Sequence, residues 1–256
     1  MSDLEVRIEE GALWLTLNRP EQFNALTGGM VVESIQQIRG ATAREDVSVV
    51  VLTGTGGAFS AGADLGGENA HENYDYRSVD AANQVIRAIT ELDKPVVCGL
   101  NGIAAGVGMS VALAADLVVA TESAALTLAF TKVGLMPDGG ATATIAASVG
   151  RARAMRLALL SDLISAREAY DAGLVSHVFA DEDYAEGLGK IVRRLSTGAP
   201  LAFAATKKAV NAATLGGLGE AFQRERAGQS LLLRTEDVAE GMRAFAEKRR
   251  PEFKGR

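Results

Sequence analysis

FSAGADL at residues 59–65 and NGIAAGVGM at residues 101–109 are the two stretches that decide the fold of this chain. Each follows an apolar, strand-like run and leads into a helix-like segment. Such glycine-rich turns present backbone N–H groups rather than side chains to a ligand. Two helix starts that converge on one oxygen atom form a fixed pair of donors for developing negative charge. We therefore expect a site that stabilises an enolate.

The composition is that of an ordinary globular protein. The chain has 256 residues, of which 48% are hydrophobic and 23% charged, enough for one domain or one domain with an appendage. Its net charge of −6 disfavours nucleic acid and anionic membrane surfaces as partners. Cys98 is the single cysteine and there are two histidines, so the sequence indicates no disulfide and no metal cluster. The polar start lacks a secretory signal, and we expect a cytoplasmic protein.

One uncharged stretch, residues 96–115, is long enough to span a membrane. However, Pro95 precedes it, Asn101-Gly102 is a turn sequence in its middle, and further glycines interrupt any helix. We interpret it as a buried strand, a turn and a buried helix, with no membrane span.

The order of the expected elements predicts a mixed α/β fold. Alternating apolar residues on either side of Glu10-Gly11 predict a β-hairpin. Strands and helices then recur as β-β-α units. The expected helices of this part are residues 30–38, 81–92 and 110–115, and the expected strands are residues 47–52, 95–100, 117–120 and 126–130.

After Gly139-Gly140 the pattern becomes mostly helical. Ser165 is a candidate N-cap and Gly173 a candidate stop for one of these helices. Residues 183–250 alternate helical segments with glycine-rich breaks, which predicts a helical appendage. The other expected elements are helices at residues 141–149, 151–160 and 166–172 and a last strand at residues 174–179.

The segment of residues 66–80 is polar and directly follows the first glycine stretch. It is either a mobile flap over a pocket or an ordinary solvated loop or short helix. Tyr74 and Tyr76 within it either shape the pocket or serve packing.

Several familiar motifs fail in this sequence. The glycines at residues 54–57 and at residues 106–108 lack the third glycine of a dinucleotide-binding turn, because Phe59 and Val111 stand in its place. There is also no P-loop and no Gly-x-Ser-x-Gly motif. His177 lies in an apolar run and is interpreted as a packed or hydrogen-bonded residue rather than a base.

Six groups of residues, in order along nearly the whole chain, resemble the enoyl-CoA hydratase/isomerase (crotonase) superfamily. These are NRP at 18–20 with NAL at 24–26, AFSAGADL at 58–65, KPV at 94–96 with NGIAAGVG at 101–108, GLMPDGG at 134–140, AREA at 166–169 with GLV at 173–175, and FAEKRR at 245–250. The resemblance implies a spiral core of ββα units, which we place at residues 1–195. It also implies a C-terminal helical region, residues 196–256, that builds a homotrimer or a dimer of trimers.

The resemblance further implies an acyl-CoA thioester whose carbonyl oxygen lies between the N–H groups of Ala63 and Val107. The family commonly has glycine at the second position; Val107 keeps the N–H but adds bulk. Coenzyme A is part of the substrate, so no separate cofactor is expected. Asp64 also fits an N-cap, and Lys248 a solvated charge. Besides the oxyanion pair, the implied coenzyme A contacts are Gln22, Phe23, Ala61, Asp64, Leu65 and Gly106, with Phe245 and Lys248 reaching a neighbouring subunit.

The type of reaction depends on three positions. Ser110 and Phe130 match the two glutamates with which the hydratases activate water, and neither can transfer a proton at neutral pH. Ser110 could still orient a water molecule or the substrate. Asp138 alone fits a turn or helix cap, but the resemblance makes it the proton-transferring aspartate of several double-bond isomerases, or the nucleophile of a dehalogenase branch. Burial beside Phe130 and Met136 is expected to raise its pKa.

We therefore expect an acyl-CoA isomerase that converts a 3-enoyl-CoA or a related thioester into its 2-enoyl isomer, with Asp138 as base and acid. The first alternative is an enoyl-CoA hydratase in which Asp138 alone handles water. A dehalogenase is less well supported, because nothing marks a pocket for an aromatic halide. A catalytically silent acyl-CoA binding protein is the alternative from a different class.

Overall fold

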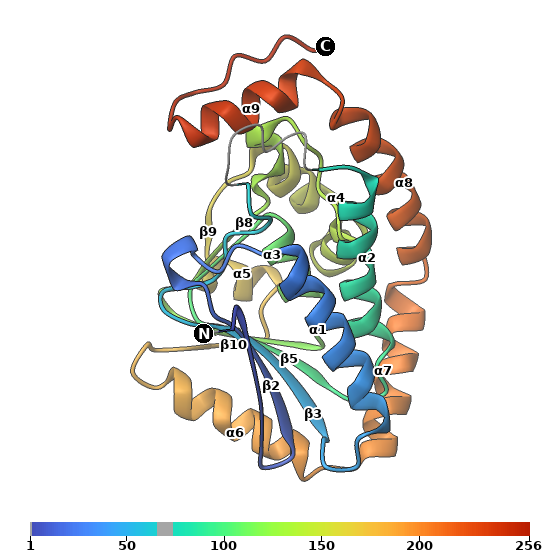
Figure 1. Cartoon of the computed structure of the whole chain (residues 1–256). Coiled ribbons are helices and arrows are strands. Elements are labelled where there is room, and N and C mark those ends of the chain that lie inside the picture. The colour runs from blue at the N-terminus through green and yellow to red at the C-terminus, as the bar shows by residue number, and fades with distance from the viewer. Residues whose placement is uncertain (1, 66–73) are drawn as a thin grey trace.

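The structure, a computed structural model, describes residues 2–65 and 74–256, and its strands form two sheets (Figure 1). The six-stranded sheet has the order β1-β2-β3-β5-β7-β10 and the four-stranded sheet the order β4-β6-β8-β9. The strands of the large sheet are β1 (Leu4–Glu9), β2 (Ala12–Leu17), β3 (Val49–Gly54), β5 (Val96–Leu100), β7 (Leu117–Thr121) and β10 (His177–Phe179). Those of the small sheet are β4 (Ala58–Ser60), β6 (Ile103–Ala105), β8 (Ala125–Thr127) and β9 (Ile164–Ser165).

The large sheet begins with the predicted hairpin. β1 and β2 are antiparallel, and the turn between them uses Glu10 and Gly11, both with positive φ. From β2 onward all neighbouring strands are parallel.

Both faces of the parallel strands are covered, which explains their continuous apolar runs. Successive residues point to opposite faces, so Val50 and Leu52 join the main core while Val49 and Val51 face the other side. There Leu188 and its neighbours on α6 pack against them. Figure 1 shows α6 on one side of the strands and α1 and α2 on the other. The bounds are α1 (Gly28–Gly40), α2 (Tyr76–Glu91) and α6 (Tyr184–Ser196).

The β-β-α repeat is confirmed, and the small sheet explains its form. In each unit a strand of the large sheet is followed by a short strand of the small sheet and then by a helix. The short strand β4 overlaps the start of the first glycine stretch and β6 lies inside the second, and neither was expected as a separate strand. The units are β3-β4-α2, β5-β6-α3 and β7-β8-α4, with α3 (Val107–Ala114), the 3₁₀ helix η4 (Ala129–Val133) and α4 (Ala141–Leu160).

The strand expected at residues 126–130 is too long. β8 ends at Thr127, and Phe130 lies in the 3₁₀ helix η4. Side chains turn the backbone here: the Thr127 hydroxyl donates to the Ser161 carbonyl, and the Ser161 hydroxyl donates to the Leu128 carbonyl.

The strand expected at residues 174–179 is also too long, because β10 covers only His177–Phe179. The preceding helix, α5 (Ala166–Ala172), has the expected N-cap at Ser165 and ends at Gly173 with φ of 87°. The N–H of Leu174 donates back to the Ala169 carbonyl at 2.8 Å, so it belongs to the end of the helix.

Two other helices refine the expectations. α2 begins at Tyr76, with the Asp75 side chain as its N-cap, and not at residue 81. The rest of the segment expected as a flap or loop, residues 66–73, lies outside the described residues. α4 contains both helices expected at residues 141–160, separated by a non-helical Gly150.

The C-terminal part contains α7 (Pro200–Thr214), α8 (Leu218–Leu232) and α9 (Glu236–Ala246). α8 packs against α2 and α4, and α9 packs against η4. The division into a core and a C-terminal oligomerisation region stays a prediction. Over the described ranges, no helix has the length and apolar character needed to cross a membrane.

Candidate active site

The candidate site lies where three parallel strands of the small sheet end. Ala63 follows β4, Val107 follows β6 and Asp138 follows β8 along the chain. Because the carboxyl ends of parallel strands meet at one edge of a sheet, the fold brings these segments together. The Gly106 N–H donates to the Thr127 carbonyl at 3.0 Å, which ties the second segment to the third.

Ala63 lies in an extended segment that forms a parallel bridge with Leu26. The bridge uses the neighbours of Ala63: the Gly62 carbonyl accepts from Leu26 at 2.8 Å, and the Asp64 N–H donates to Leu26 at 3.2 Å. Alternate residues of an extended strand direct their N–H groups to opposite sides, so that of Ala63 points away from Leu26. Among the described residues this N–H has no hydrogen-bond partner.

Val107 is the first residue of α3. The N–H groups of Met109 and Ser110 both donate to the Gly106 carbonyl, whereas that of Val107 has no partner in the described part of the chain. Gly106 has φ of 52° and ψ of −131°, a conformation that glycine adopts readily. The positive end of the α3 dipole adds to the field at this N–H group.

The segments that carry these two N–H groups touch each other. A Cβ added at Gly62 would lie 2.8 Å from the Ala105 carbonyl oxygen. A Cβ added at Gly108, at the start of α3, would lie 2.8 Å from Ser60, the last residue of β4. The glycines therefore allow a close approach that a larger residue would prevent.

Asp138 is buried, with 8% of its surface exposed. Its Oδ2 accepts a hydrogen bond of 2.8 Å from Nε2 of Gln229 on α8. Its Oδ1 has no hydrogen-bond partner among the described residues. A buried carboxyl with one unpaired oxygen is suited to exchanging a proton with a bound molecule.

Burial raises the pKa of Asp138 from 3.8 to about 7. The hydrogen bond from Gln229 acts in the opposite direction, and the nearby carboxyl of Glu225 raises the pKa further. Both protonation states of Asp138 are therefore populated near neutral pH, which agrees with the expectation from the sequence.

The backbone around Asp138 is held from two sides. The Ser110 hydroxyl on α3 donates to the Asp138 carbonyl at 2.8 Å. On the other side, the Glu225 carboxylate accepts from the N–H groups of Gly140 and Thr142 at 2.7 and 3.0 Å. Glu225 is fully buried, and these bonds satisfy its oxygens.

Ser110 and Phe130, at the positions of the hydratase glutamates, are both buried. The Ser110 hydroxyl is bonded to the backbone of Asp138, so it holds the Asp138 turn. Phe130 contributes apolar surface from η4 and packs in the main core. Neither side chain can transfer a proton in this site.

The candidate coenzyme A contacts near the N-terminus lie beside the first glycine stretch. Gln22 ends the 3₁₀ helix η1 (Pro20–Gln22), and Phe23 follows it with φ of 49° and 61% of its surface exposed. The Ala61 N–H donates to the Phe23 carbonyl at 2.8 Å. Asn24 fixes this arrangement, because its side chain donates to the Ala58 carbonyl at 2.8 Å.

Asp64 does not cap α2, whose N-cap is Asp75. Its carboxylate forms an ion pair of 2.8 Å with Arg19. Leu65 next to it packs in a small apolar cluster with Val133 on η4. These residues surround the segment that carries Ala63.

Phe245 lies in the last turn of α9, and Lys248 follows the C-cap Glu247. Phe245 is 64% exposed, and the Lys248 side chain forms no ion pair with the described residues. Their role at the coenzyme A of a neighbouring subunit stays a prediction.

His177 is exposed on β10, at the edge of the large sheet. Its Nδ1 lies 3.2 Å from the Ser176 hydroxyl, and its ring stacks on Phe179. This agrees with a hydrogen-bonded residue, although the ring is less buried than a packed residue would be.

Three buried polar residues on helices α2 and α8 were missed in the sequence, and two of them belong to the site. Glu225 and Gln229 lie on the buried stripe of α8 and contact the Asp138 loop, and Asn83 lies on the buried side of α2, where its Oδ1 has no partner among the described residues. Polar residues at the apolar positions of a helix were the signal that could have found them.

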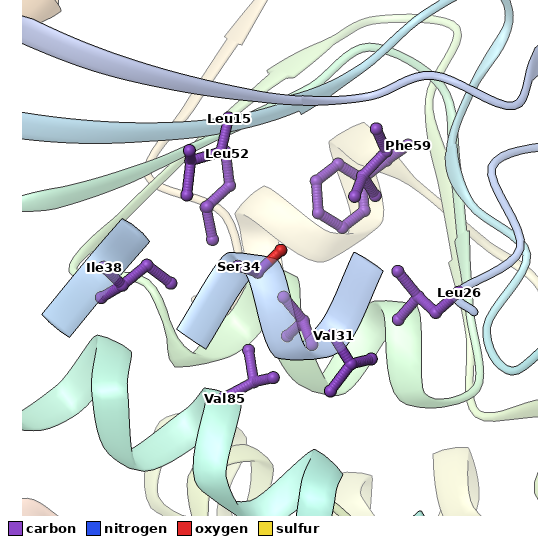
Figure 2. A pocket seen from close by; sticks show the side chains of 10 residues that line it. Leu15, Leu26, Val31, Ser34, Ile38, Leu52, Phe59 and Val85 are labelled. Carbon is purple, nitrogen blue, oxygen red and sulfur yellow. The ribbon is translucent and has the colours of Figure 1, made fainter. Parts of the chain in front are cut away.

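A small apolar cavity of about 30 Å³ lies between the large sheet and helices α1 and α2 (Figure 2). Figure 2 shows Leu26 and Phe59 on its wall and the Ser34 hydroxyl from α1 beside it. Leu26 connects this wall to the Ala63 segment through the bridge described above. Asp138 does not line this cavity, whose volume is that of about one water molecule.

Comparison with known proteins gives a consistent result. Residues 7–256 match the family model of enoyl-CoA hydratase/isomerase. A 1,2-epoxyphenylacetyl-CoA isomerase of Escherichia coli is 36% identical over 97% of both chains, and a probable enoyl-CoA hydratase of Rhodobacter capsulatus is 40% identical over 99% of this chain and 98% of that protein. The crystal structure of an enoyl-CoA hydratase from Mycobacterium avium subsp. paratuberculosis superposes with a TM-score of 0.93 at 43% identity, covering 99% of each chain. The fold, the matched length and these relatives establish that this chain belongs to the enoyl-CoA hydratase/isomerase (crotonase) superfamily, whose members act on acyl-CoA thioesters.

Proposed function

We propose that the protein is an enoyl-CoA isomerase that converts a 3-enoyl-CoA, or a related unsaturated thioester, into its 2-enoyl isomer. The observation that carries this proposal is Asp138, a buried carboxyl whose Oδ1 has no partner in the described part of the chain and whose pKa is raised to about 7. A group with this pKa can both accept and return a proton at neutral pH.

In the proposed reaction Asp138 removes a proton from C2 of the 3-enoyl-CoA. The C2–H bond breaks, and its electrons delocalise over C2, C3, C4 and the thioester oxygen to give a dienolate. Asp138 then returns the proton to C4, so that the double bond moves from C3–C4 to C2–C3. One carboxyl therefore suffices, and this chemistry requires no separate cofactor.

The N–H groups of Ala63 and Val107 are proposed to stabilise the thioester oxygen as it gains charge. Both lack a partner among the described residues, and their segments are in contact. Loss of one such donor typically costs about a hundredfold to a thousandfold in rate. Coenzyme A is proposed to lie along Gln22, Phe23, Ala61, Asp64, Leu65 and Gly106. We propose a homotrimer or a dimer of trimers, in which Phe245 and Lys248 reach the coenzyme A of a neighbouring subunit.

Hydration of a 2-enoyl-CoA is the second candidate. The names of two of the relatives described above, at 40% and 43% identity, favour it. The side chains at the two glutamate positions argue against it, because Ser110 is bonded to the Asp138 backbone and Phe130 has no polar group. Hydration would depend on Asp138 alone to activate water.

The test compares 2-enoyl-CoA and 3-enoyl-CoA as substrates of the wild type, Asp138→Asn and the control Asp171→Asn, an exposed aspartate on α5. We expect the wild type and the control to shift the double bond of the 3-enoyl-CoA. Asp138→Asn should be slower by about a thousandfold.

If the wild type adds water to 2-enoyl-CoA and does not shift the double bond of 3-enoyl-CoA, the protein is a hydratase and the isomerase proposal is wrong. Equal rates for Asp138→Asn and the wild type would contradict Asp138 as the base. Tight coenzyme A binding without any turnover would favour the silent acyl-CoA binding protein.

A further inference from the structure

Gln229 on α8 connects two points of the Asp138 loop through its side-chain amide. Its Oε1 accepts from the Met136 backbone N–H at 3.2 Å, and its Nε2 donates to Asp138 Oδ2 at 2.8 Å. The residue is 2% exposed, and it lies 91 positions from Asp138 in the sequence. The proton-transfer mechanism above does not use it.

The orientation of this amide is fixed by its partners. The Met136 N–H can only donate, so it requires the amide oxygen of Gln229 on its side. The amide nitrogen, which can only donate, must then face Asp138 and occupy Oδ2. Oδ1 is left without a partner among the described residues.

We infer that Gln229 is a positioning residue that determines which oxygen of Asp138 exchanges the proton. It holds Oδ2 as a hydrogen-bond acceptor and leaves Oδ1 for the acyl group. This inference rests on the proposed role of Asp138 as the base. It gives α8, in the C-terminal part of the chain, a direct contribution to the site.

The hydrogen bond also sets the proton affinity of Asp138, because it favours the ionised carboxylate. The charged group that acts against it is Glu225, one turn earlier on α8. The other described elements at this loop contribute uncharged groups: Ser110 on α3 and Ile86 on α2, whose Cγ1 lies 3.7 Å from a Cβ built at Gly139.

The charged side chains between α2 and α8 have partners of their own. Arg226 pairs with Asp80 at 2.7 Å, and Arg87 lies over the Phe222 ring. Burial is the largest cause of the raised pKa of Asp138, and Gln229 and Glu225 are the neighbouring groups that lower it and raise it, respectively.

The test replaces Gln229 by Met, which keeps the volume and removes the hydrogen bond, and by Glu, which keeps an acceptor for Met136. Gln223→Met, at an exposed position of the same helix, is the matched control. The pH dependence of kcat is measured with an enoyl-CoA, and the pKa of Asp138 is measured by carbon-13 NMR of labelled aspartate, with Asp138→Asn for assignment.

For Gln229→Met we expect the pKa and the acid limb of the profile to rise by about one unit. At pH 6, kcat should fall about tenfold, with less than a threefold change in KM, and part of the loss should return at pH 9. Gln229→Glu should raise the pKa further, because two neighbouring carboxyls then share a proton. Gln223→Met should match the wild type.

A lower melting temperature with an unchanged Asp138 pKa and pH profile in both variants would reduce Gln229 to a structural role and overturn the inference. The NMR titration requires no activity. A shifted pKa in a protein that does not isomerise 3-enoyl-CoA would therefore refute the proposed function and leave the hydrogen-bond control of Asp138 standing.

Discussion

The two halves of the candidate site are built by different means. The Ala63 and Val107 segments offer backbone N–H groups, and the sheets and glycines hold them in place. The Asp138 loop offers a side chain, and other side chains hold it: Ser110, Glu225 and Gln229. Substitutions at the Ala63 and Val107 segments should act by moving the backbone. Substitutions around the Asp138 loop should act by changing the pKa or the orientation of the Asp138 carboxyl.

After the loss expected for Asp138→Asn, the largest effect on kcat is expected where a side chain would separate the two backbone segments. Gly108→Ala places a Cβ 2.8 Å from Ser60, so α3 must move away from β4. We expect kcat to fall by about a hundredfold or more, because the Val107 N–H leaves its position. Gly219→Ala is the control, since Gly219 is also the second residue of a helix and its Cβ would meet nothing within 4 Å. Similar kcat values for the two variants would refute the claim that the close approach of the two backbone segments places the Val107 N–H for the reaction.

The second effect concerns stability at the Asp138 loop. The folded state binds the Asp138 proton more tightly, because the pKa rises from 3.8 to about 7. The free energy of unfolding therefore falls as the pH rises from about 4 to about 7, and this loss is constant above that range. Asp138→Asn carries no titrating group at this position, so it does not lose this free energy of unfolding. The variant should therefore be more stable than the wild type at pH 8 by about 2 kcal/mol or more.

The measurement is thermal unfolding of the wild type and Asp138→Asn from pH 4 to pH 8. We expect the variant to melt about 5 °C higher at pH 8 and at nearly the same temperature at pH 4. A difference that does not vary with pH would argue against a raised pKa.

The third effect is a shift of the Asp138 pKa in the direction opposite to the one expected for Gln229→Met. Glu225→Gln removes the carboxyl that raises the pKa of Asp138, so the acid limb of the pH profile should move to lower pH. The amide also cannot accept from both Gly140 and Thr142 as well as the carboxylate does, and kcat should fall about tenfold. Glu220→Gln, at an exposed ion pair of α8, is the control. If the acid limb of the Glu225→Gln profile moved to higher pH, Glu225 would not be a group that raises the pKa of Asp138.

The smallest effect is expected for Ser110→Ala. The variant loses one hydrogen bond to the Asp138 carbonyl, worth about 1 kcal/mol. We expect kcat to fall about threefold without a shift of the pH profile. Ser230→Ala on α8 is the control, because that hydroxyl donates to the Arg226 carbonyl of its own helix and to no other described residue. A loss of activity as large as that of Asp138→Asn would show that Ser110 takes part in proton transfer.

The same comparison explains what the sequence could predict. The two glycine stretches could be recognised locally from a strand-like run and a glycine turn, but the choice of Ala63 and Val107 came from family resemblance. Val107 does begin a helix, whereas Ala63 lies in an extended segment that pairs with Leu26. The interpretation of Asp138 came from family resemblance, because a Pro-Asp-Gly-Gly turn alone fits a cap equally well. Its burial and raised pKa then agreed with the expectation.

The partners of Asp138 could not be predicted in the same way. Gln229 and Glu225 reach the loop across 91 and 85 positions of sequence, and no local pattern encodes such a contact. The small sheet was missed for a related reason, since β4 and β6 are three residues each and are recognised as strands only by their pairing, β4 with β6 and β6 with β8. Tertiary contacts, rather than local preferences, determine both features.

The most direct test of the account is a crystal structure of Asp138→Asn with a 2-enoyl-CoA bound. The account predicts the thioester oxygen at about 2.7–3.1 Å from the backbone nitrogens of both Ala63 and Val107. It also predicts C2 and C4 of the acyl group beside the residue at position 138. A thioester oxygen bound elsewhere, or an acyl chain that leads away from position 138, would contradict it.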